Sequence, residues 1–297
     1  MDENFGFTGR KKRLPYKKRV FIARAVSVAV LSAIVIGAFC IWTAVYMRKR
    51  SGTVSETLFA PDNADREVAS LAVGDIPVPF VADLSEFEEY MNPDTDEYLF
   101  LVNSEHTLPE TYAPFDLVAA PNVRQGYGTL YMREYAAKAL AAMMTEAQAN
   151  GFKVGAAADG KTLSVISAYR SYAKQKSNFE RALNSYLAQG YSYDIAYKLT
   201  CEYYALPGSS EHQTGLCCDI TTQVGDLNDD FANTDIAVWL AENAHRFGFI
   251  LRYPKGREDS TGINFEPWHF RYVGRKYATE IYESGQTLEE YMSGRES

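Results

Sequence analysis

A histidine and an aspartate stand seven residues apart in a short segment that contains a glycine. The segment reads SEHQTGLCCD and covers residues 210–219. An imidazole at His212 and a carboxylate at Asp219, one on either side of a turn, can converge on one metal ion. Zinc binds His nitrogen and Asp oxygen at about 2.0–2.2 Å, and catalytic zinc sites combine three protein ligands with a position left for water. A third protein ligand is therefore expected elsewhere in the chain.

The chain contains four histidines, so the candidates for this third ligand are His106, His245 and His269. His269 is the best of them, and it lies in the segment FEPWHFRY. The proline argues against a helix interior, and the alternating aromatic residues favour a strand or a sharp turn. Glu266 stands three residues before His269. A carboxylate there could take a proton from water while zinc activates that water and polarises a carbonyl. The pattern indicates amide hydrolysis.

Each of these residues also has a structural explanation. A lone histidine is more often solvated or packed in a core, and Asp219 could be a cap. His245 is expected near the C-terminus of a helix, where an imidazolium suits the helix dipole, and His106 is expected to brace a loop. Cys217 shares a strand face with Asp219 and could be a soft ligand, although a compact core side chain is the preferred interpretation. The acidic segment 226–230 lacks the spacing of a calcium loop and is interpreted as solvated.

The elements that must position these residues are a mixture of helices and short strands. Apolar periodicity and stop signals predict helices over residues 85–90, 132–149, 172–188, 194–204 and 236–246. The same criteria predict strands over residues 98–102, 163–168, 216–222 and 249–252. This mixture predicts an α+β fold.

The first 50 residues differ in charge from the rest of the chain. They carry eleven Lys or Arg residues and two acidic residues, a net charge of +9, which leaves −17 for the remainder of a chain of net charge −8. Residues 25–47 are uncharged, and 23 helical residues at about 1.5 Å each span a hydrocarbon core of roughly 30 Å. Eight basic residues precede this stretch and three follow it, which favours a cytoplasmic N-terminus.

The alternatives for the apolar stretch are a cleaved signal peptide and a buried core helix. A signal peptide normally has an apolar region of about 7–15 residues and a small-residue cleavage site, whereas here Met47 is followed by Arg48, Lys49 and Arg50. A core helix would show a polar face. We therefore predict a basic cytoplasmic tail (1–24), a transmembrane signal-anchor helix (25–47), a linker (48–83) and an extracytoplasmic domain (84–297).

Composition excludes some classes of function. The predicted exported part is acidic, whereas nucleic-acid binding requires clustered Lys and Arg, so no nucleic-acid partner is expected. Cys40 lies in the predicted membrane helix, and Cys201, Cys217 and Cys218 allow at most one intrachain disulfide.

The motifs together resemble a known family. Residues 210–219 resemble the S-x-H-x-x-G-x-x-x-D signature of the VanY-type zinc D-alanyl-D-alanine carboxypeptidases, and EPWH at 266–269 resembles their second signature. The resemblance extends over roughly residues 98–275, with no departure at the matched metal positions. Its further segments are LVN (101–103), LP (108–109), SAYRS (167–171), WLAENAH (239–245) and RYPKG (252–256).

The resemblance implies the small α+β zinc peptidase fold shared with the Hedgehog signalling domain, in which a central antiparallel sheet carries the metal. It implies one zinc ion held by His212, Asp219 and His269, with Glu266 as the catalytic base. Glu266 would take a proton from water and later protonate the leaving D-alanine.

The resemblance also assigns roles to three further polar residues. Arg170 would lie near the scissile bond or the substrate carboxylate, where a guanidinium can stabilise an oxyanion. Gln175 and Ser210 match positions that bind the C-terminal end of the peptide, although Gln and Ser are also common at helix surfaces and caps.

The expected activity is removal of the terminal D-alanine from peptidoglycan stem peptides. An L,D-carboxypeptidase that acts on tetrapeptide stems is the closest alternative, because such enzymes share the matched motifs. A D,D-dipeptidase is less favoured for a tethered, exported domain. A domain that binds wall peptides without cleaving them is a further alternative, but a structural zinc site needs no free base such as Glu266.

Overall fold

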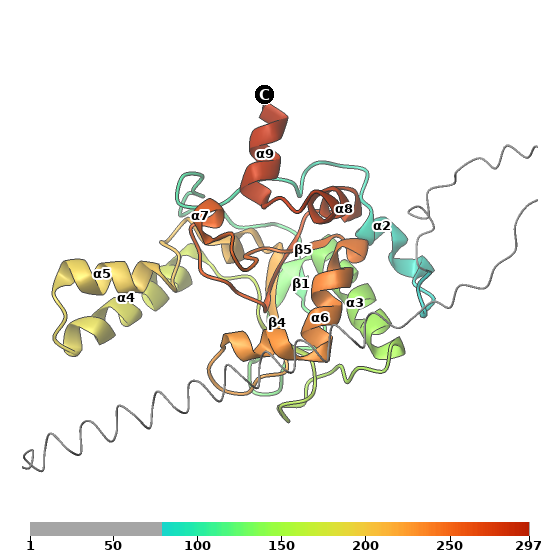
Figure 1. Ribbon diagram of the computed structural model, residues 1–297, viewed down its shortest axis with the longest axis horizontal. Coiled ribbons are helices and arrows are strands. Elements are labelled where there is room, and N and C mark those ends of the chain that lie inside the picture. Colours follow the sequence, from blue (N-terminus) through green and yellow to red (C-terminus); the bar gives the residue numbers. More distant parts are fainter. Residues whose placement is uncertain (1–78, 297) are drawn as a thin grey trace, which may run out of the picture. The chain divides into compact units, whose positions relative to one another are not determined.

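The computed structural model describes residues 79–296 (Figure 1). The predicted tail, membrane helix and nearly all of the predicted linker lie outside the described residues. Within residues 79–296, no helix combines the length and the apolar composition needed to cross a bilayer.

Helices and short strands alternate along the described chain. The α-helices are α2 (Glu88–Met91), α3 (Glu134–Ala149), α4 (Tyr172–Ala188), α5 (Tyr193–Cys201), α6 (Asp235–Asn243), α7 (Glu258–Thr261), α8 (Arg275–Ser284) and α9 (Leu288–Glu296). The 3-10 helices are η1 (Ser85–Phe87), η2 (Glu211–Thr214), η3 (Asp229–Asn233) and η4 (Ala244–Phe247). The strands are β1 (Leu117–Ala119), β2 (Tyr131–Arg133), β3 (Ser164–Ser167), β4 (Cys217–Thr221), β5 (Phe249–Leu251) and β6 (His269–Tyr272).

The central sheet has the strand order β3-β4-β6-β5, and each neighbouring pair is antiparallel. A separate pair, β1 and β2, is also antiparallel. The predicted α+β class and central antiparallel sheet are confirmed. Figure 1 shows the α4–α5 hairpin standing out from the part of the molecule that contains the sheet.

One face of the sheet packs against the apolar core, and the other carries candidate metal ligands. In β4, Cys218 and Ile220 join the main apolar core, and in β6 the same is true of Phe270 and Tyr272. Alanine, leucine and methionine side chains of α3 complete that core. Because side chains alternate across a strand, the intervening residues of β4 and β6 face the opposite side of the sheet. That opposite side carries Asp219 and His269.

Several predicted elements differ from the structure in type or in bounds; for example, the predicted helix 194–204 ends at Cys201 and the predicted helix 236–246 is divided into α6 and η4. The predicted strand 98–102 is wrong, because no strand forms there. The carbonyl oxygens of Tyr98 and Phe100 instead accept hydrogen bonds of 3.1 and 2.9 Å from the Arg271 guanidinium. A buried side chain thus replaces a neighbouring strand as their partner. The predicted helix 132–149 begins only at Glu134, because the residues before it pair with β1 as β2.

The packed structure begins before the predicted domain start at residue 84. The backbone N–H groups of Val81 and Ala82 donate to the Glu146 carboxylate at 2.9 and 2.8 Å. Phe80 packs on Phe247, with ring centroids 5.2 Å apart. Glu146 on α3 is itself buried, so the chain before η1 is anchored by a buried carboxylate.

Gly248, which follows η4, occupies a backbone conformation that only glycine tolerates here. Its φ is +87°, and a Cβ atom would lie 2.8 Å from the Tyr272 ring and 3.1 Å from the backbone of Gly274. We expect Gly248→Ala to lower the free energy of unfolding by about 2–5 kcal/mol, since a left-handed conformation costs about 1–2 and overpacking about 1–3.

Gly262→Ala is the matched control, because Gly262 has a φ of +71° and a methyl group added there would meet no atom within 4 Å. Its cost should be limited to about 1–2 kcal/mol for the backbone conformation. Denaturant unfolding of both variants measures the difference. Equal losses of stability would contradict the packing argument.

Candidate metal and catalytic site

The β4–β6 pairing brings a carboxylate and an imidazole into contact. Asp219 and His269 are direct antiparallel partners. The Oδ1 atom of Asp219 lies 3.0 Å from Nδ1 of His269, and its Oδ2 atom lies 3.5 Å from Nε2 of His212. All three side chains are almost fully buried. The structure therefore brings together the three residues that the sequence predicted as metal ligands.

His212 reaches the sheet from η2, one turn before β4. Its Nδ1 atom lies 2.7 Å from the carbonyl oxygen of Ala168, which leaves Nε2 directed towards Asp219. In return, the backbone N–H of Arg170 donates to the His212 carbonyl at 2.9 Å. Gly215 ends η2 with a φ of +69°, and a side chain there would press on Leu117. The glycine of the signature thus lets the chain turn from η2 into β4.

The ionisable groups of this site influence one another strongly. Burial, assisted by the nearby Arg170 guanidinium, lowers the pKa of His212 to about 3, so its imidazole is neutral. Burial alone would raise the pKa of Asp219, but His212, His269 and Arg170 outweigh it and lower the pKa to about 2. A neutral imidazole and an ionised carboxylate are the forms that bind zinc.

The opposite effect is seen at His269. Burial by itself would lower the pKa of this imidazole, but Cys217, Asp219 and Glu211 together raise it well above its usual value. The surroundings of His269 therefore favour positive charge. Two imidazoles and a carboxylate form the set of possible ligands, and they lie buried in surroundings that favour positive charge. This set fits a zinc ion.

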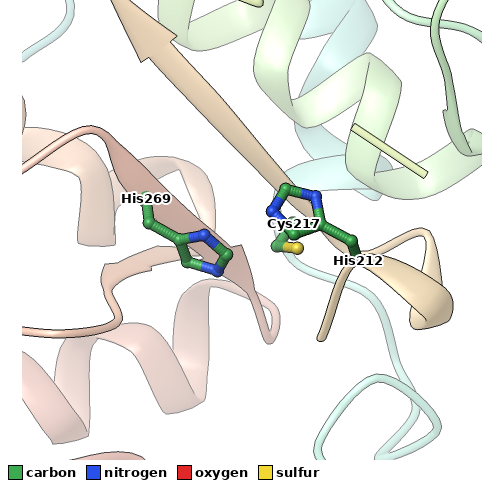
Figure 2. Close-up of side chains that lie close together, drawn as sticks. All are labelled: His212, Cys217 and His269. Atoms are coloured by element: carbon green, nitrogen blue, oxygen red, sulfur yellow. The ribbon is translucent and has the colours of Figure 1, made fainter. Parts of the chain in front are cut away.

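Cys217 is an alternative to Asp219 as the ligand that joins His212 and His269 at the metal. Ligand atoms of His212, Cys217 and His269 all lie within 4.8 Å of one another, and Figure 2 shows these three side chains coming from η2, β4 and β6. Burial raises the pKa of the Cys217 thiol, however, which opposes the thiolate form that binds metals. Asp219 is already ionised and contacts both imidazoles, so it is the stronger candidate.

Glu266 lies on the Nδ1 side of His269. Its backbone carbonyl accepts from the His269 N–H at 3.2 Å, which closes a turn over Glu266–His269 with Pro267 at its second position. The turn brings Oε2 of Glu266 to 3.6 Å from Nδ1 of His269, and 22% of the Glu266 side chain stays exposed. Burial raises the pKa of Glu266 to about 7, which suits a group that must both accept and return a proton.

Arg170 follows β3 and is held by two side chains. Its guanidinium donates to Oε1 of Gln175 at 2.7 Å and to Oγ of Ser167 at 3.1 Å. Gln175 is buried on α4 and donates to the carbonyl of Ala205 at 2.6 Å. In this structure Gln175 thus orients Arg170. Ser210 is buried at the N-cap of η2, where its side chain makes no capping hydrogen bond.

The remaining histidines and cysteines have structural roles or none assigned. His106 braces a loop, because its backbone N–H and its Nδ1 atom both contact Oδ1 of Asn103. His245 stacks on Tyr282 with ring centroids 4.0 Å apart. The expected imidazolium is wrong, since burial, together with Arg246, lowers the pKa of His245 to about 4 and keeps the ring neutral. Cys201, Cys217 and Cys218 are free thiols.

Sequence reasoning missed Glu211. This residue stands next to His212 and is fully buried, with Oε2 lying 3.5 Å from Nε2 of His269. The available signal was its position inside the signature, between two predicted site residues.

Comparison with known proteins places this site in a family. The sequence model of the VanY family, described as D-alanyl-D-alanine carboxypeptidase, matches residues 129–275. The chain is 38% identical over 211 residues to YodJ of Bacillus subtilis (strain 168), and the match covers 69% of this chain and 70% of YodJ. The chain belongs to the VanY family.

Solved structures of VanY relatives share its fold. The LD-carboxypeptidase LdcB is 38% identical, with a TM-score of 0.55 over 65% of this chain and 84% of LdcB. VanYB in complex with D-alanine-D-alanine is 34% identical, with a TM-score of 0.53 over 66% of this chain and 98% of VanYB. A variant of the VanY D,D-pentapeptidase from the VanB-type resistance cassette, in complex with Zn(II), is 33% identical, with a TM-score of 0.53 over the same shares.

The choice between Asp219 and Cys217 can be tested by zinc affinity. We expect one zinc ion per chain, and we expect Asp219→Asn to weaken zinc binding by more than about 100-fold, because a lost ligand costs more than the 10–100-fold of a lost outer partner. Cys217→Ala should change the affinity by less than about 3-fold. Competition with a chromophoric chelator measures both, and the reverse ranking would make Cys217 the ligand.

Proposed function

We propose that this VanY-family chain is a zinc-dependent D-alanyl-D-alanine carboxypeptidase that removes the terminal D-alanine from peptidoglycan stem peptides. The observation that carries this proposal is the position of Glu266. Its carboxylate lies on the same side of His269 as the Asp219 oxygen, within 3.6 Å of Nδ1. A structural metal site has no need of such a carboxylate, whereas hydrolysis does.

His212, Asp219 and His269 would hold the zinc ion, which supplies Lewis-acid polarisation of the scissile carbonyl and activation of water when bound. Glu266 takes a proton from the attacking water, because a carboxylate with a pKa of about 7 is a competent base near neutral pH. The same carboxyl group then returns the proton to the amine of the leaving D-alanine.

Arg170 would supply a positive charge that complements negative charge on the substrate. Its guanidinium is preoriented by Gln175 and Ser167, so little reorganisation is needed when negative charge develops on the substrate. It either stabilises the oxyanion or pairs with the terminal carboxylate. Ser210 would contact the same end of the peptide. Gln175, which uses both ends of its amide on protein groups, would act through Arg170.

An L,D-carboxypeptidase is the second candidate. It is supported by the 38% sequence identity to the LD-carboxypeptidase LdcB, the same value as the identity to YodJ. The proposed zinc ligands and base would serve either reaction, because both release a terminal D-alanine and differ in the configuration of the residue before it.

Release of D-alanine from pentapeptide and tetrapeptide stems tests both candidates. We expect zinc-dependent release from the pentapeptide that is lost with a chelator and restored by zinc. Glu266→Gln should lower kcat/KM by about 10²–10⁴-fold, the usual contribution of a general base. Glu242→Gln on the exposed face of α6 is the control and should be as active as the wild type.

The outcomes separate the candidates. Release from the tetrapeptide alone would assign the L,D activity. No release from either peptide by a chain with zinc bound would contradict both, and would favour a domain that binds wall peptides without cleaving them.

We propose that residues 25–47 anchor the chain in the cell membrane, with residues 1–24 in the cytoplasm and the catalytic domain outside. The uncharged stretch and the excess of basic residues before it support this arrangement. Because contacts of the domain already involve Phe80 and Val81, the linker is expected to end before residue 80.

Membrane fractionation tests the anchor. The full chain should stay in the membrane pellet after an alkaline wash, whereas a chain of residues 48–297 without an export signal should be found in the supernatant. Exposing intact spheroplasts to protease should degrade the domain of the full chain. Protection of the domain from that protease would reverse the proposed orientation.

A further inference from the structure

Glu211 and His269 present two buried polar atoms that face each other. Within the described residues, Oε2 of Glu211 and Nε2 of His269 have no hydrogen-bond partner although both are inaccessible to solvent. They lie 3.5 Å apart. Buried polar atoms are costly when unpaired, so a small approach that converts this contact into a hydrogen bond is favoured.

The second oxygen of the Glu211 carboxylate, Oε1, already accepts two hydrogen bonds. This atom accepts from Nε of Arg252 at 2.8 Å and from the Arg271 guanidinium at 2.9 Å. Both arginines are completely buried. Two guanidinium groups on one oxygen fix the plane of the carboxylate, and only Oε2 remains to interact with His269.

The arginines are in turn held from outside the site. The Arg252 guanidinium donates to both oxygens of Glu289 on α9, at 2.8 and 2.5 Å. Arg271 donates to the carbonyl oxygens of Tyr98 and Phe100, in the segment that forms no strand. Glu211 is therefore clamped from two sides, by the C-terminal helix and by the chain before β1.

The two nitrogens of His269 consequently have different surroundings. Nδ1 faces Asp219 and Glu266, at 3.0 and 3.6 Å. Nε2 faces the clamped Glu211 carboxylate, at 3.5 Å. A carboxylate that accepts from one ring nitrogen places the proton there, leaves the lone pair on the other nitrogen and holds the ring in orientation.

We propose that Glu211, clamped by Arg252 and Arg271, is the positioning residue that holds His269 as the Nε2–H tautomer and directs its Nδ1 atom to the metal. Resting on the proposed zinc-dependent function, this inference extends it to a residue outside the ligand set. Glu211 touches neither metal nor substrate in this role and acts through His269.

The test uses the full chain in detergent, with histidines labelled with ¹⁵N. Only four histidines are present, so their side-chain signals can be assigned by substitution. With ¹¹³Cd in place of zinc, we expect coupling of the metal to Nδ1 of His269 and a slowly exchanging proton on Nε2. Coupling to Nε2 of His269 would overturn the proposal, and this measurement requires no change at Glu211.

Glu211→Gln supplies the second readout. The amide keeps the volume but removes the charge, so we expect zinc affinity to fall by about 10–100-fold. Glu146→Gln is the matched control, because Glu146 is an equally buried carboxylate outside the site that accepts hydrogen bonds from the backbone N–H groups of Val81 and Ala82 and from the Asn150 side chain. Both variants should lose stability, but only Glu211→Gln should alter zinc affinity and the His269 signals.

The outcomes distinguish this inference from the proposed function. A folded Glu211→Gln variant with wild-type zinc affinity would reject the role of Glu211. If that variant does not fold, the cadmium coupling in the wild type decides alone. Absence of D-alanine release from a chain with zinc bound through Nδ1 would reject the carboxypeptidase and leave the role of Glu211 intact. Failure of the wild type to bind either metal would reject both.

Discussion

The antiparallel pairing of β4 with β6 is the constraint on which the site depends. It sets Asp219 directly opposite His269, and antiparallel partners have Cβ atoms only about 4.5–5.5 Å apart. A carboxylate and an imidazole are thus held together by backbone hydrogen bonds instead of by flexible loops. β3 flanks β4 on its other edge, with Ser167 paired to Asp219, so the carboxylate lies on a strand that has neighbours on both sides.

The other functional groups are attached to this strand pair by short turns. His212 lies in η2, which Gly215 connects to β4. Glu266 begins the turn that contains Pro267 and leads into β6. Since side chains alternate along each strand, the faces that carry Asp219 and His269 are supported from behind by the apolar core. The precision of the site follows from the rigidity of the sheet and the brevity of these turns.

Buried charge is the second organising feature. Isolated buried charges are strongly unfavourable, and they persist where partners compensate them. Glu211, Arg252 and Arg271 compensate one another and extend to Glu289 on α9. Asp219, by contrast, is compensated by His269, whose surroundings favour positive charge, and by the nearby Arg170 guanidinium. A divalent cation held by these ligands would add to that compensation, so metal binding and the stability of this region are expected to be linked.

The sequence by itself determined the candidate ligands, the candidate base and the candidate arginine, together with the helix over residues 172–188 and the helical segment predicted over 236–246, which the structure divides into α6 and η4. These follow from residue type, spacing and local periodicity, which are properties of neighbouring residues. It also indicated the VanY resemblance, because that resemblance lies in short ordered motifs.

Only the tertiary structure decided the pairing of Asp219 with His269, the hydrogen bond from Arg170 to Gln175, and the buried contact between Glu211 and His269. The segment 98–102 shows why. Its strand-like pattern reflects burial, but its carbonyl groups bind Arg271, a residue about 170 positions away. Local propensity reports what a segment can form alone, whereas the partner of each buried polar group is set by long-range packing.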